Sequence, residues 1–384
     1  MIRSVWQGAQ GRTGKKRGIS RFPFALLCGK IAEKGGGEVS GRRLYWIDLL
    51  KFVGIVAIVL GHALGEGPLC TYLYAFHVPM FFFASGCAFR RTKERFGAFA
   101  LRKLRQLIVP YLLMSFLSIL ALYAASFVME LPLGIRFTQP WYRYAWGILY
   151  ANGKSGMLKA NAPLWFLPCM FCVLLMLYGV AHLAKGKKLV YAALTALSAA
   201  IGLLNERFRV IDRWPLGFET ALHMLPFALM GYAFRSVSEK IEMLPDARKA
   251  VAGIALLAAG TAVQMGFDVS GLYMFDRYSS LALLYVCALA ISVGVELLGM
   301  VKALPHLRQI SYVGGHTFVI LLLHKFPLLV FRYLCPGIGP RLLAGSVPLA
   351  LAATAVTLAL CLAAEKPLAR ICPALLGRRR KQAV

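Results

Sequence analysis

Long apolar stretches with almost no charged residues recur along the chain, separated by short polar segments. Most have about 18 or more nearly uncharged residues, the length that crosses a bilayer as a helix, and the fifth and sixth are shorter. They lie near residues 44–64, 69–89, 107–129, 162–184, 189–204, 219–234, 249–266, 279–300, 311–331 and 342–364. The alternation expected of a membrane barrel is absent. The pattern predicts an all-α polytopic membrane protein with about ten transmembrane helices in one bundle.

Composition agrees with this prediction. Hydrophobic residues make up 59% of the chain and charged residues only 16%. A soluble globular chain carries roughly 25% charged residues, so this one has too little charge to cover a water-facing surface. The length of 384 residues would allow two soluble domains, but the apolar runs exclude that class.

The net charge is +28, and the distribution of the basic residues along the chain indicates the orientation in the membrane. With an even number of spans and an inner N-terminus, 32 of the 44 Lys and Arg residues fall on the inner side and 10 on the outer side. This positive-inside bias predicts an inner-membrane protein with both termini cytoplasmic. Such loops bind lipid headgroups or an anionic substrate, and no aromatic-interleaved module supports nucleic-acid binding.

The two ends of the chain are basic and flank the predicted transmembrane domain at 44–365. We expect residues 1–43 to be a disordered cytoplasmic tail and residues 366–384 a second basic cytoplasmic tail. The apolar stretch within the first tail is too short to span a membrane and lacks a small-residue cleavage site. An alternative is that translation starts close to Val39.

Cysteines and common motifs add little. The C-x-x-C at Cys169 and Cys172 lies within a lipid-length helix, with no second pair and no histidine cluster nearby. We interpret these cysteines as packing residues, and we predict no metal site. The chain contains no P-loop, no G-x-S-x-G and no H-E-x-x-H.

Ionisable residues inside a membrane are costly and therefore mark functional candidates. The first span contains Asp48, Lys51 and His62. The first two are neighbours on one helix face, and His62 lies about 16 Å further along nearly the same face. A snorkelling Asp–Lys pair and a packing histidine are the alternatives.

Two further features lie close in sequence. The run F-H-V-P at 76–79 places His77 near the same outer turn as His62, so we expect these histidines to face each other. A basic cytoplasmic stretch follows, in which Arg102 and Arg105 lie one turn apart and can clamp one polyanion. A plain positive-inside anchor is the alternative for the two arginines.

Together these motifs carry a family resemblance. The spacing from Asp48 and Lys51 to His62, the F-H-V-P-M-F-F-F-A-S-G run at 76–86 and the R-K-L-R-Q-L-I-V-P-Y run at 102–111 resemble the acyltransferase-3 superfamily of membrane O-acyltransferases. The branch that it most resembles acetylates fucose and surface polysaccharides. The P-L-W-F-L-P run at 163–168 and the V-I-L-L-L-H run at 319–324 are similar to later elements of that family.

The resemblance implies transfer of an acyl group, usually acetyl, from cytoplasmic acyl-CoA to a hydroxyl of a cell-surface or lipid-linked glycan. It implies no bound cofactor, with acetyl-CoA as co-substrate. His62 would act as general base or as transient acyl carrier, assisted by Lys51, Asp48 and His77. Arg102 and Arg105 would hold the CoA phosphates. The residues expected to line the acceptor site are Trp165, Phe166, His324, His223 and Glu219.

Other interpretations stay open. Trp165 and Phe166 are also typical of a membrane interface, and the histidines and Glu219 of buried hydrogen-bonded groups. Succinyl is the alternative to acetyl as the transferred group. A proton-coupled transporter or flippase would also place ionisable groups along one helix face. A cytoplasmic R-x-x-R beside the F-H-x-P helix disfavours that class, and the lack of a fused soluble domain disfavours a sensor or scaffold.

Overall fold

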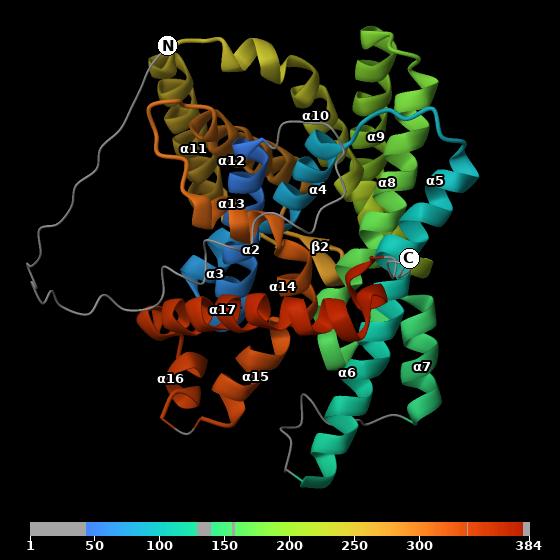
Figure 1. The fold of residues 1–384 in the computed structure, drawn as a ribbon. Coiled ribbons are helices and arrows are strands. Elements are labelled where there is room, and N and C mark those ends of the chain that lie inside the picture. The colour runs from blue at the N-terminus through green and yellow to red at the C-terminus, as the bar shows by residue number, and fades with distance from the viewer. Residues whose placement is uncertain (1–43, 129–139, 156–157, 336, 379–384) are drawn as a thin grey trace, which may run out of the picture. The chain divides into compact units, whose positions relative to one another are not determined.

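A computed structural model describes residues 44–128, 140–155, 158–335 and 337–378 (Figure 1). The structure is 81% helical, and the predicted all-α polytopic membrane fold is confirmed. Eight helices of the described part are long and apolar enough to cross a membrane. The predicted tail at 1–43 lies outside the described residues, as do residues 379–384 of the second predicted tail. Residues 366–371 continue the last long helix.

The first half of the chain forms the helices that surround the candidate site. These are α2 (Tyr45–Leu64), α3 (Pro68–Tyr74), α4 (His77–Ala88), α5 (Phe96–Lys103), the π-helical turn η1 (Leu104–Ile108), α6 (Val109–Val128), α7 (Trp141–Tyr150), η2 (Gly153–Ser155), η3 (Lys159–Trp165), α8 (Phe166–Leu183) and α9 (Lys188–Phe208).

The second half adds η4 (Pro215–Gly217), α10 (Phe218–Glu242), α11 (Asp246–Phe267), β1 (Gly271–Leu272), η5 (Tyr273–Phe275), β2 (Arg277–Tyr278), α12 (Leu281–Gly299), α13 (Arg308–Gly315), α14 (Thr317–Leu323), α15 (Lys325–Tyr333), α16 (Gly339–Leu343), α17 (Val347–Ile371) and η6 (Pro373–Leu376). The two short strands pair antiparallel, with Gly271 opposite Tyr278.

Two predicted spans differ from the others. The segment at 219–234 forms the longer α10, which is not among the eight helices that are long and apolar enough to cross a membrane. The segment at 311–331 is not one helix, because it breaks at His316 and again at His324 into α13, α14 and α15. Pro327 has no N–H to donate to the carbonyl of Leu323, which favours the second break.

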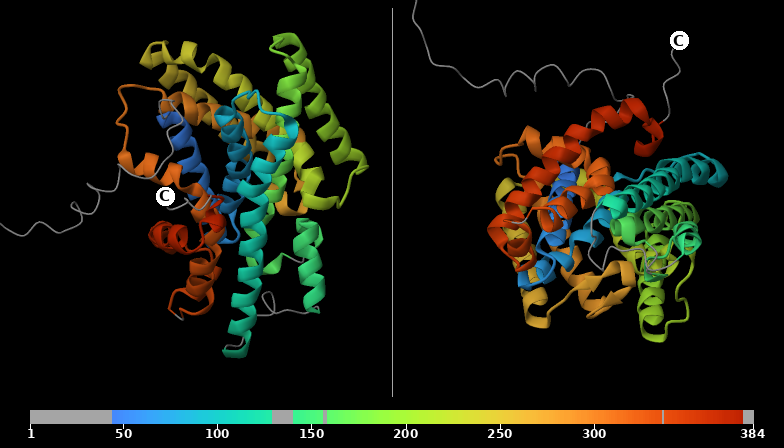
Figure 2. Two further views of the ribbon diagram at one scale, coloured as in Figure 1. Left: turned by 45° about the vertical axis from the view of Figure 1, so that its right-hand side comes forward. Right: turned by 90° about the horizontal axis from the view of Figure 1, so that it is seen from below.

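Helix α2 lies at the centre of this arrangement and packs against α4, α12, α13 and α17. Its last turn ends at Gly65, whose φ of 77° suits glycine, and Pro68 starts α3. Figures 1 and 2 show α17 running across the bundle instead of alongside α11 and α12. The central position of α2 puts its charged and imidazole side chains inside protein instead of lipid.

Close helix contacts depend on glycine. A Cβ on Gly86 of α4 would overlap the backbone of Ala228 in α10, and one on Gly231 would overlap the backbone of Phe83. Small residues of this kind let membrane helices approach and pack closely. The α4–α10 pair therefore forms a tight wall behind the candidate site.

Candidate active site

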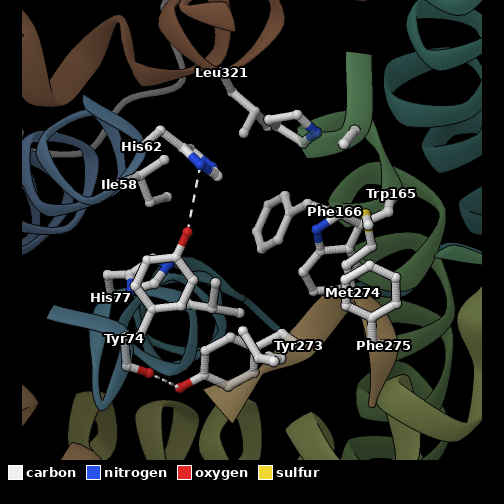
Figure 3. A pocket seen from close by; sticks show the side chains of 14 residues that line it. Ile58, His62, Tyr74, His77, Trp165, Phe166, Tyr273, Met274, Phe275 and Leu321 are labelled. Carbon is white, nitrogen blue, oxygen red and sulfur yellow. Dashed lines mark hydrogen bonds between the residues drawn. The ribbon is translucent and has the colours of Figure 1, made fainter. Parts of the chain in front are cut away.

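The aromatic residues Tyr74 and His77 lie beside His62 (Figure 3). The Tyr74 hydroxyl lies 3.4 Å from Nδ1 of His62, and its ring packs edge-on against His77 at 4.6 Å. We expected the two histidines to face each other; both line the same cavity, and Tyr74 contacts both rings. Nδ1 of His77 donates to the Leu73 carbonyl at 2.7 Å, so Nε2 of His77 carries the lone pair.

A third histidine completes the group. His324 is fully buried and stacks on His62, with ring centroids 5.4 Å apart. Its Nδ1 donates to the carbonyls of Ile320 and Leu321 at 2.9 and 3.0 Å, because a carbonyl can only accept. Nε2 is therefore the acceptor nitrogen, and it has no hydrogen-bond partner among the described residues. The break between α14 and α15 sets this ring beside α2.

A cavity of about 160 Å³, here called the His62 cavity, opens beside these rings (Figure 3). His62, Tyr74 and His77 line one side, and the predicted acceptor residues Trp165 and Phe166 line it as well. The wall is completed by the β1–β2 hairpin through Leu272, Tyr273, Met274 and Phe275. Imidazole and aromatic groups thus meet around one mostly apolar space.

A second cavity of about 200 Å³, the Lys51 cavity, adjoins the first. Both are lined by Ile58, Phe166 and Leu321. Lys51 lies at the second cavity, with Nζ 3.2 Å from Asp48, so the predicted contact between these neighbours is present. The two cavities together follow α2 from Lys51 to His62, and their walls are mainly apolar.

The predicted R-x-x-R arginines lie at the junction of α5 and η1. Arg102 makes two contacts to Glu94, at 3.2 Å from Nε and 2.7 Å from Nη2. The guanidinium group of Arg102 is therefore already paired with a carboxylate, whereas we expected both arginines to be available for a polyanion. This hydrogen bond lowers the pKa of Glu94. Arg105 is exposed.

The loop that supplies Glu94 forms an open basic cavity of about 590 Å³. It includes Arg91, Lys93 and Arg95. The Tyr178 hydroxyl donates to the Glu94 carbonyl at 2.6 Å, and His182 donates to the Thr92 carbonyl at 2.9 Å. Helix α8 therefore holds a cluster of positive charge next to Arg102.

Three predicted acceptor residues do not line the His62 cavity: His324, which stacks on His62, and the pair of His223 and Glu219. His223 and Glu219 are both buried in a neighbouring polar group, here called the Asp276 cluster. Its members are Asn152, Lys154, Asn205, Arg209, Asp212, Glu219, Thr220, His223, Asp276 and Tyr278. His223 donates to Asp276 at 2.7 Å, and Glu219 accepts from Asn152 at 2.8 Å.

Asp276 is the centre of this cluster and is fully buried. Burial alone would raise its pKa, but the hydrogen bond from His223 and the charges of His223 and Lys154 hold the pKa below its ordinary value. Arg209 adds a contact at 2.7 Å. The cluster anchors the hairpin that lines the His62 cavity, because Asp276 directly follows Phe275.

Sequence reasoning missed three residues next to His62. Tyr74 could have been found from the sequence, because it precedes His77 by three residues. The same spacing marked Asp48 and Lys51 as neighbours on one helix face. Tyr273 lines the cavity and donates to the Tyr74 carbonyl at 2.8 Å, and Arg332 donates to the backbone of α2. Both come from distant segments, and no local pattern marks them.

Comparison with known proteins identifies the family. A family model described as an acyltransferase domain matches residues 44–366. Neither the curated proteins nor the solved structures include a match to this chain. Since the family model covers most of the chain, including every element of the site described above, the chain belongs to the acyltransferase-3 family and is a membrane acyltransferase.

Proposed function

We propose that the protein transfers an acetyl group from cytoplasmic acetyl-CoA to a hydroxyl of a cell-surface or lipid-linked glycan. The observation that carries this proposal is the pair of adjoining cavities between Lys51 and His62. A thioester arm is long, narrow and largely apolar between its polar groups, and it fits a passage of this kind. The donor would enter from the Lys51 side and present its acyl carbon at His62.

The proposed donor site lies on the side of the basic loop. Arg105 is exposed, and Arg91, Lys93 and Arg95 form an open cavity that can receive the phosphates of CoA. Arg102 would exchange Glu94 for a phosphate when the donor binds, because both are anionic oxygen acceptors for the same fork.

The proposed chemistry is general-base catalysis at an imidazole. The acceptor hydroxyl loses its proton to Nε2 of His62 as its oxygen attacks the thioester carbon, and the CoA thiolate leaves. The Tyr74 hydroxyl, at 3.4 Å, orients the ring through Nδ1. Attack by His62 itself, with a transient acyl-imidazole, uses the same geometry. His324, which stacks on His62 from outside the cavity lining, would help to hold that ring in place.

Trp165 and Phe166 are placed to contact the acceptor, because they line the wall across from the histidines. Aromatic faces bury the apolar side of a sugar ring while its hydroxyls stay hydrogen-bonded. We propose the inner membrane as the location, with both termini cytoplasmic, from the loop charges.

Mass spectrometry of surface glycans tests the proposal. A deletion strain should lose one acetyl mass, and complementation with the intact gene should restore it. Complementation with His62→Ala should not. A succinyl mass in place of acetyl would change the donor, and no mass difference between the strains would contradict a glycan acceptor. Transfer from acetyl-CoA by the purified chain in nanodiscs then identifies the donor directly.

A further inference from the structure

A second open site lies beside α7, outside the His62 cavity. This α7 groove has a volume of about 680 Å³. It is lined mainly by aromatic and basic side chains, namely Tyr142, Arg143, Trp146, Tyr150, Lys154 and Arg213. The proposed acyl transfer assigns no role to this groove. Helix α7 lies beside α6, to which it is joined by the Tyr111 hydroxyl, which donates to the Ile148 carbonyl at 2.8 Å (Figure 2).

The aromatic residues of the groove form one row. Tyr142, Trp146 and Tyr150 follow each other at intervals of four, so they lie on one side of the helix. Trp146 is 66% exposed, and its ring stacks with Tyr150 at a centroid distance of 6.3 Å. The Tyr150 hydroxyl donates to the Arg213 carbonyl at 2.7 Å, which fixes one end of the row. Rigid aromatic faces bind at a low entropic cost.

Positive charge lies on both walls of the groove, and none of the described residues that line it is acidic. Arg143 comes from α7 and Arg213 from the loop before η4. The Arg213 side chain is 78% exposed and lies 3.7 Å from Asp212, a loose contact that leaves most of its fork accessible. Lys154 is already committed to the Asp276 cluster. Arg213 therefore favours a carboxylate or phosphate group, and Arg143 adds to the positive charge around it.

The groove and the His62 cavity lie on two sides of one thin wall. Asn152 and Lys154 line the groove, and Gly153 between them packs directly against Met274, which lines the His62 cavity. A Cβ at Gly153 would overlap the side chain and the carbonyl of Met274. The groove therefore lies next to the His62 cavity, separated from it by the contact of Gly153 with Met274.

Exposed aromatic residues on α7 could instead belong to an aromatic belt at the membrane interface, but the residue suited to that role lies on another face of the helix. Trp141 is 79% exposed and lies about 140° around the helix from Trp146, at about 100° per residue. It does not line the groove. The residue suited to lipid is Trp141, whereas the groove face combines stacked rings with guanidinium groups.

We propose that the α7 groove binds an anionic glycan chain and thereby selects an acidic acceptor for the site at His62. This inference rests on the proposed glycan acetylation and names its substrate class. Sugar rings would lie on the Tyr142, Trp146 and Tyr150 row, and a carboxylate or phosphate of the chain would pair with Arg213, beside the positive charge of Arg143. Binding energy gained at this remote site would position the reacting sugar.

Binding without acyl donor tests the groove separately from catalysis. The full chain in nanodiscs is titrated with an alginate hexasaccharide, which is carboxylated, and with maltohexaose, which is neutral. We expect alginate to bind and maltohexaose to bind at least about tenfold more weakly, a difference of about 1.4 kcal/mol. Trp146→Ala and Arg213→Ala should each weaken alginate binding by about tenfold or more, whereas Trp141→Ala, on the same helix, should not.

Three results would overturn the inference. The first is equal binding of the neutral and the carboxylated oligosaccharide. The second is unchanged alginate binding in both groove variants. The third is that Trp146→Ala alters only the association with phosphatidylglycerol vesicles, which would make the groove a lipid site. A chain that binds alginate but transfers no acetyl group would overturn only the proposed function. Equal acetylation of neutral and acidic glycans would overturn only this inference.

Discussion

The guanidinium of Arg332 donates to the backbone carbonyl of His62 at 3.1 Å, and the same nitrogen lies 3.0 Å from the carbonyl of Ala63. Carbonyls in the last turn of a helix have no partner within the helix, and a cation there is favourable. Arg332 thus ties α15 to the end of α2 that carries the central histidine.

Arg332→Ala should therefore loosen the position of His62. Hydrogen bonds from a charged group contribute about 1.5–3 kcal/mol, so we expect a clear fall in the apparent melting temperature and in the transfer rate. The matched control is Arg341→Ala, an exposed arginine on α16. Thermal unfolding of the purified variants in detergent measures the difference. Equal losses of melting temperature in the two variants would mean that the hydrogen bonds from Arg332 to the end of α2 have no special role.

The sequence predicted the helices well and the tertiary contacts poorly, for a physical reason. A lipid-length apolar run needs only composition, which is why α2, α8 and α12 appear where expected. The break at His324 depends on tertiary packing as well as on Pro327, and a hydropathy pattern reads it as one span. Hydropathy therefore overstated the continuity of the segment at 311–331.

The same limit applies to the site. Contacts within one or two turns, such as Asp48 with Lys51, follow from helix geometry. His223 looked equivalent to His324 in sequence, because both are histidines in apolar segments. Only the fold shows that Asp276 binds one of them, while the other stacks on His62. Ionisable residues in membrane segments identify candidates but not their partners.

Donor binding should depend on Arg102 and Arg105. Loss of a charged hydrogen bond costs about 1.5–3 kcal/mol, so each Ala variant should weaken acyl-CoA binding by about 10- to 100-fold. Arg→Lys should also weaken it, because an ammonium group cannot make the bidentate contact. Glu94→Gln should strengthen binding by releasing the Arg102 fork.

Equilibrium binding of a non-hydrolysable acyl-CoA analogue to the solubilised chain measures these effects. Arg308→Ala is the matched control, because Arg308 is exposed on another predicted inner segment. Unchanged affinity in the Arg102→Ala, Arg105→Ala double variant would assign both arginines to membrane topology alone.

The Asp276 cluster predicts a pH dependence of stability. The folded pKa of Asp276 lies below its ordinary value of 3.8, so the carboxylate stabilises the fold above that pH. The stabilisation is lost as the pH falls through the folded pKa. Asp276→Asn should cost about 1–3 kcal/mol at neutral pH, because the buried His223 and the cations Lys154 and Arg209 lose their shared carboxylate. The substitution should also reduce the loss of stability between neutral and acid pH.

Apparent melting temperatures between about pH 3 and pH 7 check both expectations. Asp268→Asn is the control, because Asp268 is exposed just after α11. If the melting temperature of the Asp276→Asn variant falls as much at acid pH as that of the wild type, another group is responsible for the pH dependence.

Topology gives a further prediction. The loop charges predict a cytoplasmic C-terminus, so a reporter fused after Val384 should give a cytoplasmic signal. A cysteine introduced as Gly337→Cys, in a predicted outer segment, should react with a membrane-impermeant reagent from outside. Helix α17 lies between these two sites and runs across the bundle (Figure 1). Signals from the same side would show that α17 does not span the membrane.

His62 carries the most direct prediction. It lines the cavity with its Nδ1 next to the Tyr74 hydroxyl and its ring stacked on His324. If it removes the acceptor proton, His62→Ala should reduce acetyl transfer by about 10²- to 10⁴-fold. Protein level should stay near normal, because polar contacts between membrane helices average only about 0.6 kcal/mol. The control is His306→Ala, an exposed histidine far along the chain.

His62→Gln separates chemistry from shape, because glutamine keeps a hydrogen-bonding group but is no base at neutral pH. We expect it to be as inactive as the Ala variant in a transfer assay with acetyl-CoA. A Gln variant near the wild-type rate would make His62 a positioning residue. The base would then be His77, since its ring lines the cavity, donates from Nδ1 to the Leu73 carbonyl and keeps its Nε2 lone pair for a substrate proton.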